Sequence, residues 1–262
     1  MSVNGKATVV VVHGAWADGS SWKDVILGLE REGLRVIAAP IPLTSFGDDT
    51  AALKRAIARS EGPVILAGHA YAGAVIGAVN DERVKALVYV AGLAPEEGET
   101  VAQIFYRDEK HLQSPHLTPD ADGFIWMPDE GFRNAFSQHA TEEQIELSAA
   151  VQRPISLKCI QEPVPIPAWR SRPSWFLIAE EDRMINPKTQ HFMAKRMGAT
   201  TRPLPVDHTP LLSAPQKVVD IIMEANMAGS FQIPGEGLER HAQREHTKSS
   251  RLPEPHAKKE TL

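Results

Sequence analysis

Short apolar runs alternate along this chain with longer amphipathic segments. The run from Ala7 to Val12 is β-branched and almost free of polar residues, which is typical of a central parallel strand buried on both faces. Similar runs predict five more strands, at 34–39, 63–67, 84–90, 174–179 and 200–204. The pattern therefore predicts about six strands.

Helices are predicted between these strands, at about 21–32, 48–60, 71–79, 187–197 and 210–227. Gly33 follows the first helix as a C-terminal cap, and Asn186 and Thr209 precede the last two as N-terminal caps. Strands that alternate with helices are typical of a doubly wound, mainly parallel α/β sheet. We expect this fold class.

The alternation breaks between about residues 95 and 172. This stretch is rich in Pro, Asp, Glu and His, and it predicts only one helix, at 141–151. We interpret it as a helical lid inserted after the fourth strand, with residues 1–94 and 173–228 forming the α/β core. From residue 229 to 262 the chain is polar without periodicity, which predicts a disordered tail.

Composition excludes several classes of protein. The chain has 262 residues, of which 42% are hydrophobic, and a formal net charge of -5 without a basic block, which argues against a nucleic-acid partner. No apolar run approaches a membrane span, and the N-terminus lacks a signal-peptide pattern. The single cysteine, Cys159, favours a reducing compartment. A cytoplasmic protein without a membrane partner is expected.

The turn after the third strand has the spacing of a nucleophile elbow, G-x-S-x-G. It reads Gly68-His69-Ala70-Tyr71-Ala72, directly after an apolar strand and before a helix of small residues. Ala70 stands where the nucleophile belongs, and its methyl group cannot attack a carbonyl. Ala72 stands at the second glycine position.

Polar groups also follow the other strands, where the carboxyl ends of a parallel sheet gather functional side chains. His13-Gly14-Ala15 follows the first strand, Glu180-Glu181-Asp182 the fifth, and Asp207-His208 the sixth. A nucleophile position, then an acid, then a histidine is the chain order of α/β hydrolases. Each group alone is a weak signal, but the four in this order are a strong one.

These segments resemble the α/β-hydrolase superfamily, and within it the small branch of hydroxynitrile lyases, plant methylesterases and bacterial esterase-like proteins. The matching stretches are HGAWADGSSW at 13–22, AGHAYAGAVI at 67–76, ALVYVAGLAPEEGET at 86–100, AEEDRMI at 179–185 and VDHTPLL at 206–212. The resemblance runs from about residue 7 to residue 228.

The resemblance implies a catalytic triad with Asp182 as the acid and His208 as the base. It also implies an oxyanion hole made of the backbone N–H groups of Ala15 and Tyr71. Ala70 departs from the family's serine, which puts the usual ester hydrolysis in doubt. From the sequence, Glu180 or Glu181 remains an alternative to Asp182 as the carboxylate that orients the histidine.

The remaining candidate residues concern the ligand. Trp16, Trp126 and Phe132 are expected to line a substrate pocket under the lid, whereas His13, His69 and Cys159 are interpreted as structural. The histidines are too dispersed for metal-ligand spacing, and no G-x-G-x-x-G motif follows the first strand, so no metal and no cofactor are expected. The expected partner is a small-molecule substrate; the oligomeric state is not indicated by the sequence.

Three functions stay open at this stage. The first is hydrolase chemistry on a small, partly apolar ester, lactone or related carbonyl compound, with Ala70 either native or an engineered replacement of serine. The second is a non-covalent Asp182–His208 dyad enzyme of the lyase or cofactor-free type. The third is a ligand-binding pseudoenzyme, against which the intact acid–histidine pair speaks.

Overall fold

The central sheet has six strands in the order β2-β1-β3-β4-β7-β8, and every neighbouring pair is parallel. The computed structural model describes residues 7–228, so the predicted tail at 229–262 lies outside the described residues. The strands are β1 (Thr8–Val12), β2 (Arg35–Ala39), β3 (Val64–His69), β4 (Val84–Val90), β7 (Ser174–Ala179) and β8 (Thr200–Leu204). This confirms the doubly wound α/β fold.

Burial along the strands follows their place in the sheet. β1 is buried at all five positions because it lies between β2 and β3, with Val10 opposite Ile37 and Leu66. β8 lies at an edge and is mostly exposed, and its Pro203, which has no N–H to donate, is tolerated there.

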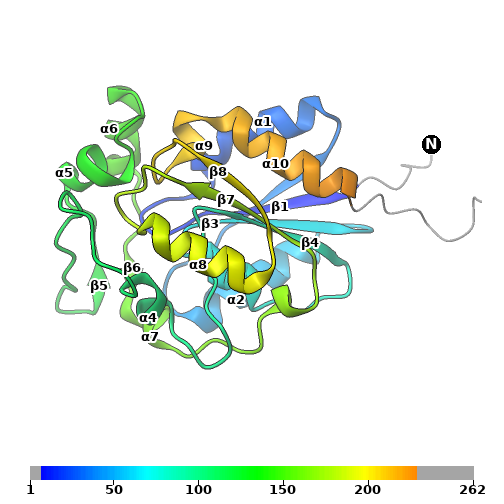
Figure 1. Cartoon of the computed structure of the whole chain (residues 1–262), viewed down its shortest axis with the longest axis horizontal. Coiled ribbons are helices and arrows are strands. Elements are labelled where there is room, and N and C mark those ends of the chain that lie inside the picture. Colours follow the sequence, from blue (N-terminus) through cyan, green and yellow to red (C-terminus); the bar gives the residue numbers. More distant parts are fainter. Residues whose placement is uncertain (1–6, 229–262) are drawn as a thin grey trace, which may run out of the picture. The chain divides into compact units, whose positions relative to one another are not determined.

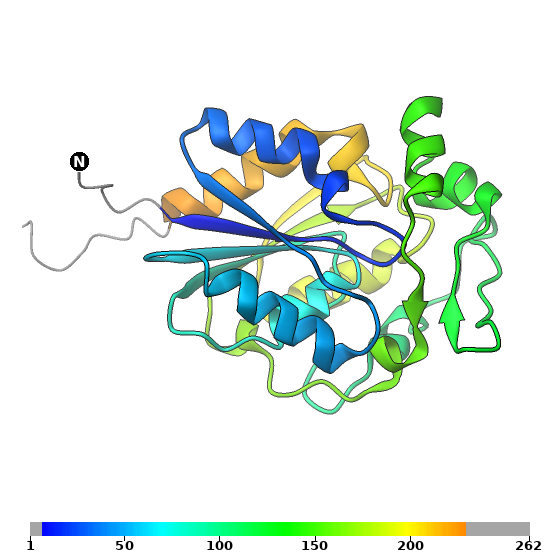
Figure 2. The same ribbon diagram turned by 180° about the vertical axis from the view of Figure 1, so that it is seen from behind.

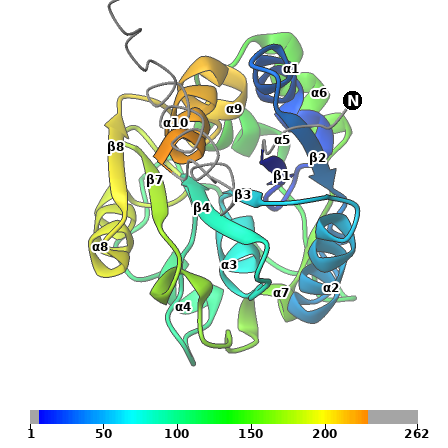
Figure 3. The same cartoon turned by 90° about the vertical axis from the view of Figure 1, so that its right-hand side faces the viewer.

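Helices cover both faces of the sheet (Figure 3). One face carries α1 (Lys23–Arg31) and α10 (Pro215–Ala228), and the other carries α2 (Phe46–Ile57), α3 (Ala72–Gly77) and α8 (Pro187–Met197). α1 and α10 approach closely at Gly28, where a Cβ atom would lie 2.7 Å from Val219 Cγ2. The glycine permits this helix contact.

The bounds of α1 and α3 lie within two residues of the prediction, and two other helices differ from it for a local reason. α2 begins at Phe46 rather than 48, because the Ser45 side chain caps it by accepting from the Asp48 N–H. The helix predicted at 210–227 is two helices, α9 (Pro210–Ser213) and α10, because Pro215 disfavours a helical conformation at Ala214. The Thr209 hydroxyl does not cap α9; it donates to Ser137 Oγ.

The segment 95–172 gathers most of its short elements at one end of the sheet (Figures 1 and 2). It contains α4 (Val101–Phe105), β5 (Phe124–Ile125), α5 (Asp129–Gly131), the short π-helix η2 (Phe132–Phe136), α6 (Glu142–Ala150), β6 (Ile155–Ser156), α7 (Leu157–Gln161) and the 3₁₀-helix η3 (Ala168–Arg170). Two of these elements have a sequence signal, the Thr100–Gln103 capping box of α4 and the Thr141–Gln144 capping box of α6, and the prediction used only the second. Between residues 7 and 228, no helix has the length and hydrophobicity needed to cross a bilayer.

Candidate active site

The turn that joins β3 to α3 places Ala70 in a left-handed backbone conformation, with φ of 49°. The Ala70 N–H donates to the Val90 carbonyl at 3.2 Å, and its own carbonyl accepts from the N–H groups of Gly73 and Leu93 at 3.0 and 2.9 Å. Left-handed conformations cost free energy in residues other than glycine, so these bonds hold the turn. The backbone of a nucleophile elbow is therefore fully formed.

Two glycines make this turn sterically possible. A Cβ atom on Gly68 would lie 2.7 Å from the Ala72 carbonyl oxygen, and one on Gly73 would lie 2.5 Å from that of Leu93. Ala72 occupies the second glycine position of the motif without conflict, because the close approach to Leu93 falls on Gly73 instead.

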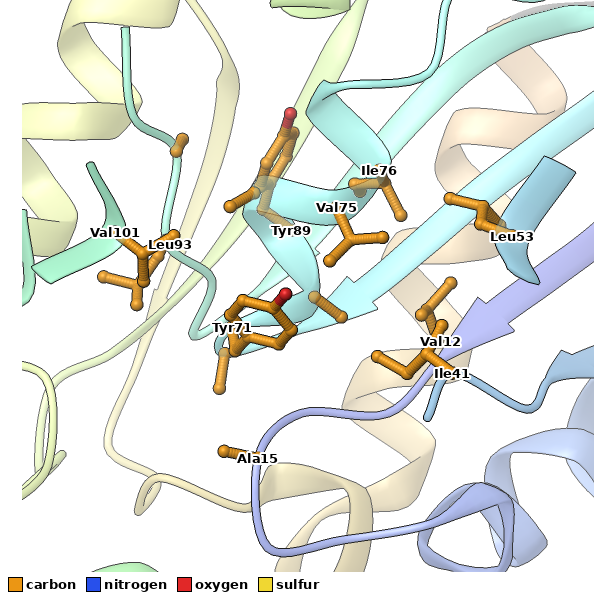
Figure 4. Packing of buried hydrophobic residues seen from close by; sticks show 14 of the residues in the cluster. Val12, Ala15, Ile41, Leu53, Tyr71, Val75, Ile76, Tyr89, Leu93 and Val101 are labelled. Carbon is orange, nitrogen blue, oxygen red and sulfur yellow. The ribbon is translucent and has the colours of Figure 1, made fainter. Parts of the chain in front are cut away.

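The loop after β1 lies directly against Ala70. A Cβ atom on Gly14 would come within 3.1 Å of the Ala70 Cβ. Figure 4 shows Ala15 on this loop and Tyr71 in the turn after β3. Within residues 7–228 neither of their backbone N–H groups has a hydrogen-bond acceptor, and both residues line one cavity. The two N–H groups are available to a ligand oxygen.

Asp182 and His208 form a buried pair at the ends of β7 and β8. The Asp182 Oδ2 lies 2.8 Å from His208 Nδ1 and accepts from Gln190 Nε2 at 2.7 Å. Its Oδ1 accepts from the N–H groups of Met184 and Ile185 at 2.7 and 2.9 Å. Because a carboxylate oxygen accepts hydrogen bonds, we assign the proton to Nδ1, which leaves Nε2 as an acceptor.

The two alternative carboxylates point elsewhere. Glu180 Oε1 lies 2.8 Å from His191 Nε2, and Glu181 Oε2 lies 3.1 Å from His139 Nε2. Neither is hydrogen-bonded to His208, so Asp182 is the carboxylate that orients this imidazole.

Gln190 was not identified from the sequence. Its Oε1 accepts from the Ala179 N–H at 3.0 Å while its Nε2 donates to Asp182, so it fixes the acid between β7 and α8. The signal was present: Gln190 shares a helical face with the buried Met193 and Ala194, and a buried amide there needs partners.

His69 packs against His208 and is hydrogen-bonded to its backbone. Its Nε2 lies 2.7 Å from the His208 carbonyl oxygen, and the two rings are 4.9 Å apart. Burial lowers the pKa of His69 to about 3, so the ring is neutral and donates from Nε2. Burial also lowers the pKa of His13, whose Nδ1 lies 3.0 Å from the Gly14 oxygen. Neither ring lines the cavity.

Ala70 lines an open cavity, and the empty space in and in front of it amounts to about 580 Å³. Its polar groups are few: the His208 imidazole faces it, while the Tyr71 hydroxyl is engaged with Asp49 and the Trp16 Nε1 with the Ile125 carbonyl. The other lining residues are mostly apolar and include Leu93, Val101, Leu117, Ile155, Ile160 and Met184. Such a site favours a mostly apolar ligand with one polar group.

Of the three residues predicted to contact a ligand, only Trp16 lines this cavity. Trp126 is 51% exposed at the surface, and Phe132 is buried against Phe136 with the ring centres 5.2 Å apart. The aromatic residues from segment 95–172 that line the cavity are Phe105, Tyr106 and Phe136. The sequence did not separate these sets because the short elements of this segment have no periodicity that tells one face from the other.

Comparison with known proteins gives a consistent family. Residues 9–221 match the pattern of the "Alpha/beta hydrolase family". Among curated proteins, a carbendazim hydrolyzing esterase from Nocardioides sp. (strain SG-4G) is 31% identical over 112 residues. That match covers 36% of this chain and 46% of the relative, so it spans less than half of the relative's length.

Solved structures share the fold at low sequence identity. A pyrethroid hydrolase from Sphingobium faniae JZ-2 aligns with a TM-score of 0.73 and 22% identity, over 86% of this chain and 98% of its own. A mutant of tomato methylketone synthase I gives 0.75 and 17%, over 87% and 100%. A methylesterase from Arabidopsis gives 0.69 and 16%, over 85% and 99%.

Proposed function

The chain belongs to the alpha/beta hydrolase family, and from that premise we propose that it acts on a small, partly apolar ester, lactone or related carbonyl compound without a covalent intermediate. One observation carries the proposal. The acceptor nitrogen of an oriented histidine, two unpaired backbone N–H groups and the Ala70 methyl belong to residues that line the same apolar cavity.

The substrate would bind with its carbonyl oxygen between the N–H groups of Ala15 and Tyr71. These donors are fixed before the ligand arrives, so they stabilise negative charge on that oxygen without reorganisation. The apolar walls hold the rest of the molecule.

The base would act through water, because Ala70 offers no hydroxyl. His208 Nε2 takes a proton from a water molecule as the water oxygen bonds to the carbonyl carbon, and Asp182 stabilises the charged imidazole. When the tetrahedral intermediate collapses, the bond to the leaving oxygen breaks and His208 returns the proton to it. The products are an acid and an alcohol, or a hydroxy acid from a lactone.

The esterase relative and the family support hydrolysis, and the missing nucleophile sets its rate. In subtilisin, removal of the serine lowers turnover about a million-fold, and the oxyanion hole and binding alone leave about a thousand-fold or more over water. Turnover by this chain is therefore slow. Should the natural gene encode serine at position 70, the same geometry serves a conventional serine esterase.

A second candidate is proton transfer to or from a substrate carbon. With no hydroxyl beside it, the His208 acceptor is free to meet a ligand directly, and carbanion charge would spread onto the carbonyl oxygen at the two N–H groups. One protein of this fold is named a synthase rather than a hydrolase.

The test compares the unchanged chain with His208→Ala. We expect the unchanged chain to hydrolyse 4-nitrophenyl acetate above the buffer rate and His208→Ala to lose about a hundredfold or more of that excess. His116→Gln, an exposed histidine substitution, is the control.

Three outcomes are distinguishable. Loss of ester turnover in His208→Ala supports hydrolysis. Deuterium exchange into acetophenone methyl protons that depends on His208, without ester turnover, supports the second candidate. Binding of acetophenone with equal affinity to both chains, without any reaction, overturns both in favour of a binding protein.

A further inference from the structure

A buried carboxylate lies behind the proposed oxyanion hole and has no role in the chemistry described so far. Asp49 of α2 has no solvent exposure. Its Oδ2 accepts from the Tyr71 hydroxyl at 2.7 Å and contacts Cys159 Sγ at 3.5 Å, while its Oδ1 accepts from the Leu43 N–H at 2.7 Å. Three segments distant in sequence thus meet at one side chain.

Packing alone does not explain an acid at this position. Within residues 7–228 Asp49 makes no ion pair, and burial raises its pKa. A carboxylate in such surroundings costs folding free energy, and an apolar side chain of similar volume often does as well or better. What Asp49 provides and an apolar side chain cannot is a set of hydrogen bonds to three donors.

Tyr71 is the partner that connects Asp49 to the cavity. Its ring packs in the core cluster with Val75 and Val101 (Figure 4). Its hydroxyl donates to Asp49, and its backbone N–H is one of the two unpaired donors. The hydrogen bond to Asp49 fixes the tip of the Tyr71 side chain, and the backbone N–H that faces the ligand belongs to the same residue. Tyr71 follows the left-handed Ala70 and precedes α3. Anchoring its side chain therefore also limits rotation of the Ala70–Tyr71 peptide group.

Asp49 also reaches the segment that covers the cavity. Leu43, which is itself in a left-handed conformation with φ of 62°, accepts from the Ser156 N–H at 3.0 Å. Cys159 lies between Ser156 and the cavity-lining Ile160. The carboxylate therefore links the elbow to β6 and α7.

We propose that Asp49 is a positioning residue, which fixes the backbone N–H of Tyr71 in the oxyanion hole by binding its hydroxyl. The inference rests on the proposed function, since that function gives the Tyr71 N–H its task. Asp49 touches no reacting atom. Its effect is on where the amide points, and hence on charge stabilisation rather than on ligand affinity.

The experiment uses the carbonyl stretch of bound acetophenone labelled with ¹³C at the carbonyl. The ketone stays intact because Ala70 cannot add to it. In the unchanged chain we expect a narrow band at lower frequency than in hexane, caused by hydrogen bonds to the oxygen. Tyr71→Phe should move the band at least halfway back or broaden it, and Asp49→Asn should act in the same direction. Tyr89→Phe is the matched control, because its buried hydroxyl has no hydrogen-bond partner among the described residues.

Kinetics in an Ala70→Ser background give the second readout. Tyr71→Phe should lower kcat for 4-nitrophenyl acetate about tenfold while KM changes less than twofold. The reason is that a misplaced oxyanion-hole N–H still stabilises the transition state in part, so the rate falls less than when such a donor is removed. A purely structural role would lower the yield of folded protein but leave kcat per folded molecule unchanged.

The outcomes separate the two proposals. If acetophenone shows no band shift in the unchanged chain, the oxyanion hole is wrong and the inference falls with it. If the shift is present and both Tyr71→Phe and Asp49→Asn keep it, with kcat unaltered, the role of Asp49 alone is overturned. If one variant does not fold, the other decides.

Discussion

The two sides of the reactive end of the cavity differ in how complete they are. On one side, Asp182 receives four donors, two of them from Gln190 and His208, so the base is held by a full set of hydrogen bonds. On the other, the turn at Ala70 has its strained backbone and its close glycine contacts, yet its side chain ends in a methyl. The hydrogen bonds that the proposed proton transfer needs are therefore in place, whereas the atom that covalent attack needs is absent.

The largest expected effect comes from supplying the missing group. Ala70→Ser should raise kcat for 4-nitrophenyl acetate by up to about a million-fold, the factor that loss of the serine costs in subtilisin. The backbone already has the required conformation, and only one oxygen is added. Ala102→Ser, which adds a hydroxyl to the cavity from α4, is the control. A gain below tenfold in kcat for folded Ala70→Ser protein would contradict the claim that the site lacks only the serine hydroxyl.

The next largest effect tests the Asp182–His208 pair. In the Ala70→Ser background, Asp182→Asn should lower kcat about ten-thousandfold, as the same exchange does in a serine protease triad, because the amide no longer holds Nδ1 as the donor. Glu181→Gln, which changes a carboxylate bonded to His139 instead, should leave kcat within about threefold. Equal losses in the two variants would contradict the assignment of Asp182.

A smaller effect concerns stability in acid. His69 has a pKa of about 3 when folded and an ordinary value of 6.5 when unfolded, so below pH 6.5 the unfolded chain binds a proton that the native chain does not. The free energy of unfolding therefore falls as the pH drops from 6.5 toward 3, by up to about 1.4 kcal/mol per pH unit from this group.

Urea unfolding at pH 7 and pH 4.5 measures this contribution. His69→Gln keeps a donor for the His208 carbonyl but does not titrate, so its loss of stability between the two pH values should be smaller by about 2.5 kcal/mol. The exposed His116→Gln should behave like the unchanged chain. An identical pH dependence in both variants would show that burial of His69 is not what makes the fold sensitive to acid.

The smallest effect separates cavity residues from surface residues of segment 95–172. Phe136 lies 5.1 Å from the His208 ring and lines the cavity, so Phe136→Ala should raise KM for aryl esters about tenfold through lost apolar contact. Trp126→Ala should change KM less than about twofold, because this side chain is at the surface. The reverse order would place the ligand elsewhere.

What the sequence predicted depended on periodicity and on local signals. The bounds of β4, β7, β8 and α8 agree with the prediction, since apolar runs and the Asn186 cap are written in adjacent residues. The approach of an acid after β7 to His208 was expected from chain order and from the rule that strand ends converge, and the family resemblance favoured Asp182 over Glu180 and Glu181. These features need no knowledge of distant contacts.

What the sequence did not predict depends on tertiary contacts. Asp49 looks like a residue of the first helical turn, and only the fold brings the Tyr71 hydroxyl to it. Likewise, only the fold shows that Gln190 donates a hydrogen bond to Asp182. In segment 95–172, elements of two to nine residues gave no face to assign, so Phe132 was predicted at the cavity where Phe136 lies.

The most direct measurement of the central claim is covalent labelling of Ala70→Ser by a fluorophosphonate, located by mass spectrometry of the peptide that contains position 70. We expect rapid labelling at that position, and its loss when His208→Ala is added to the same variant, because the proposed base, His208, is oriented by Asp182 and the proposed oxyanion hole lies in the same cavity. A folded Ala70→Ser variant that stays unlabelled, or that reacts equally well without His208, would contradict it.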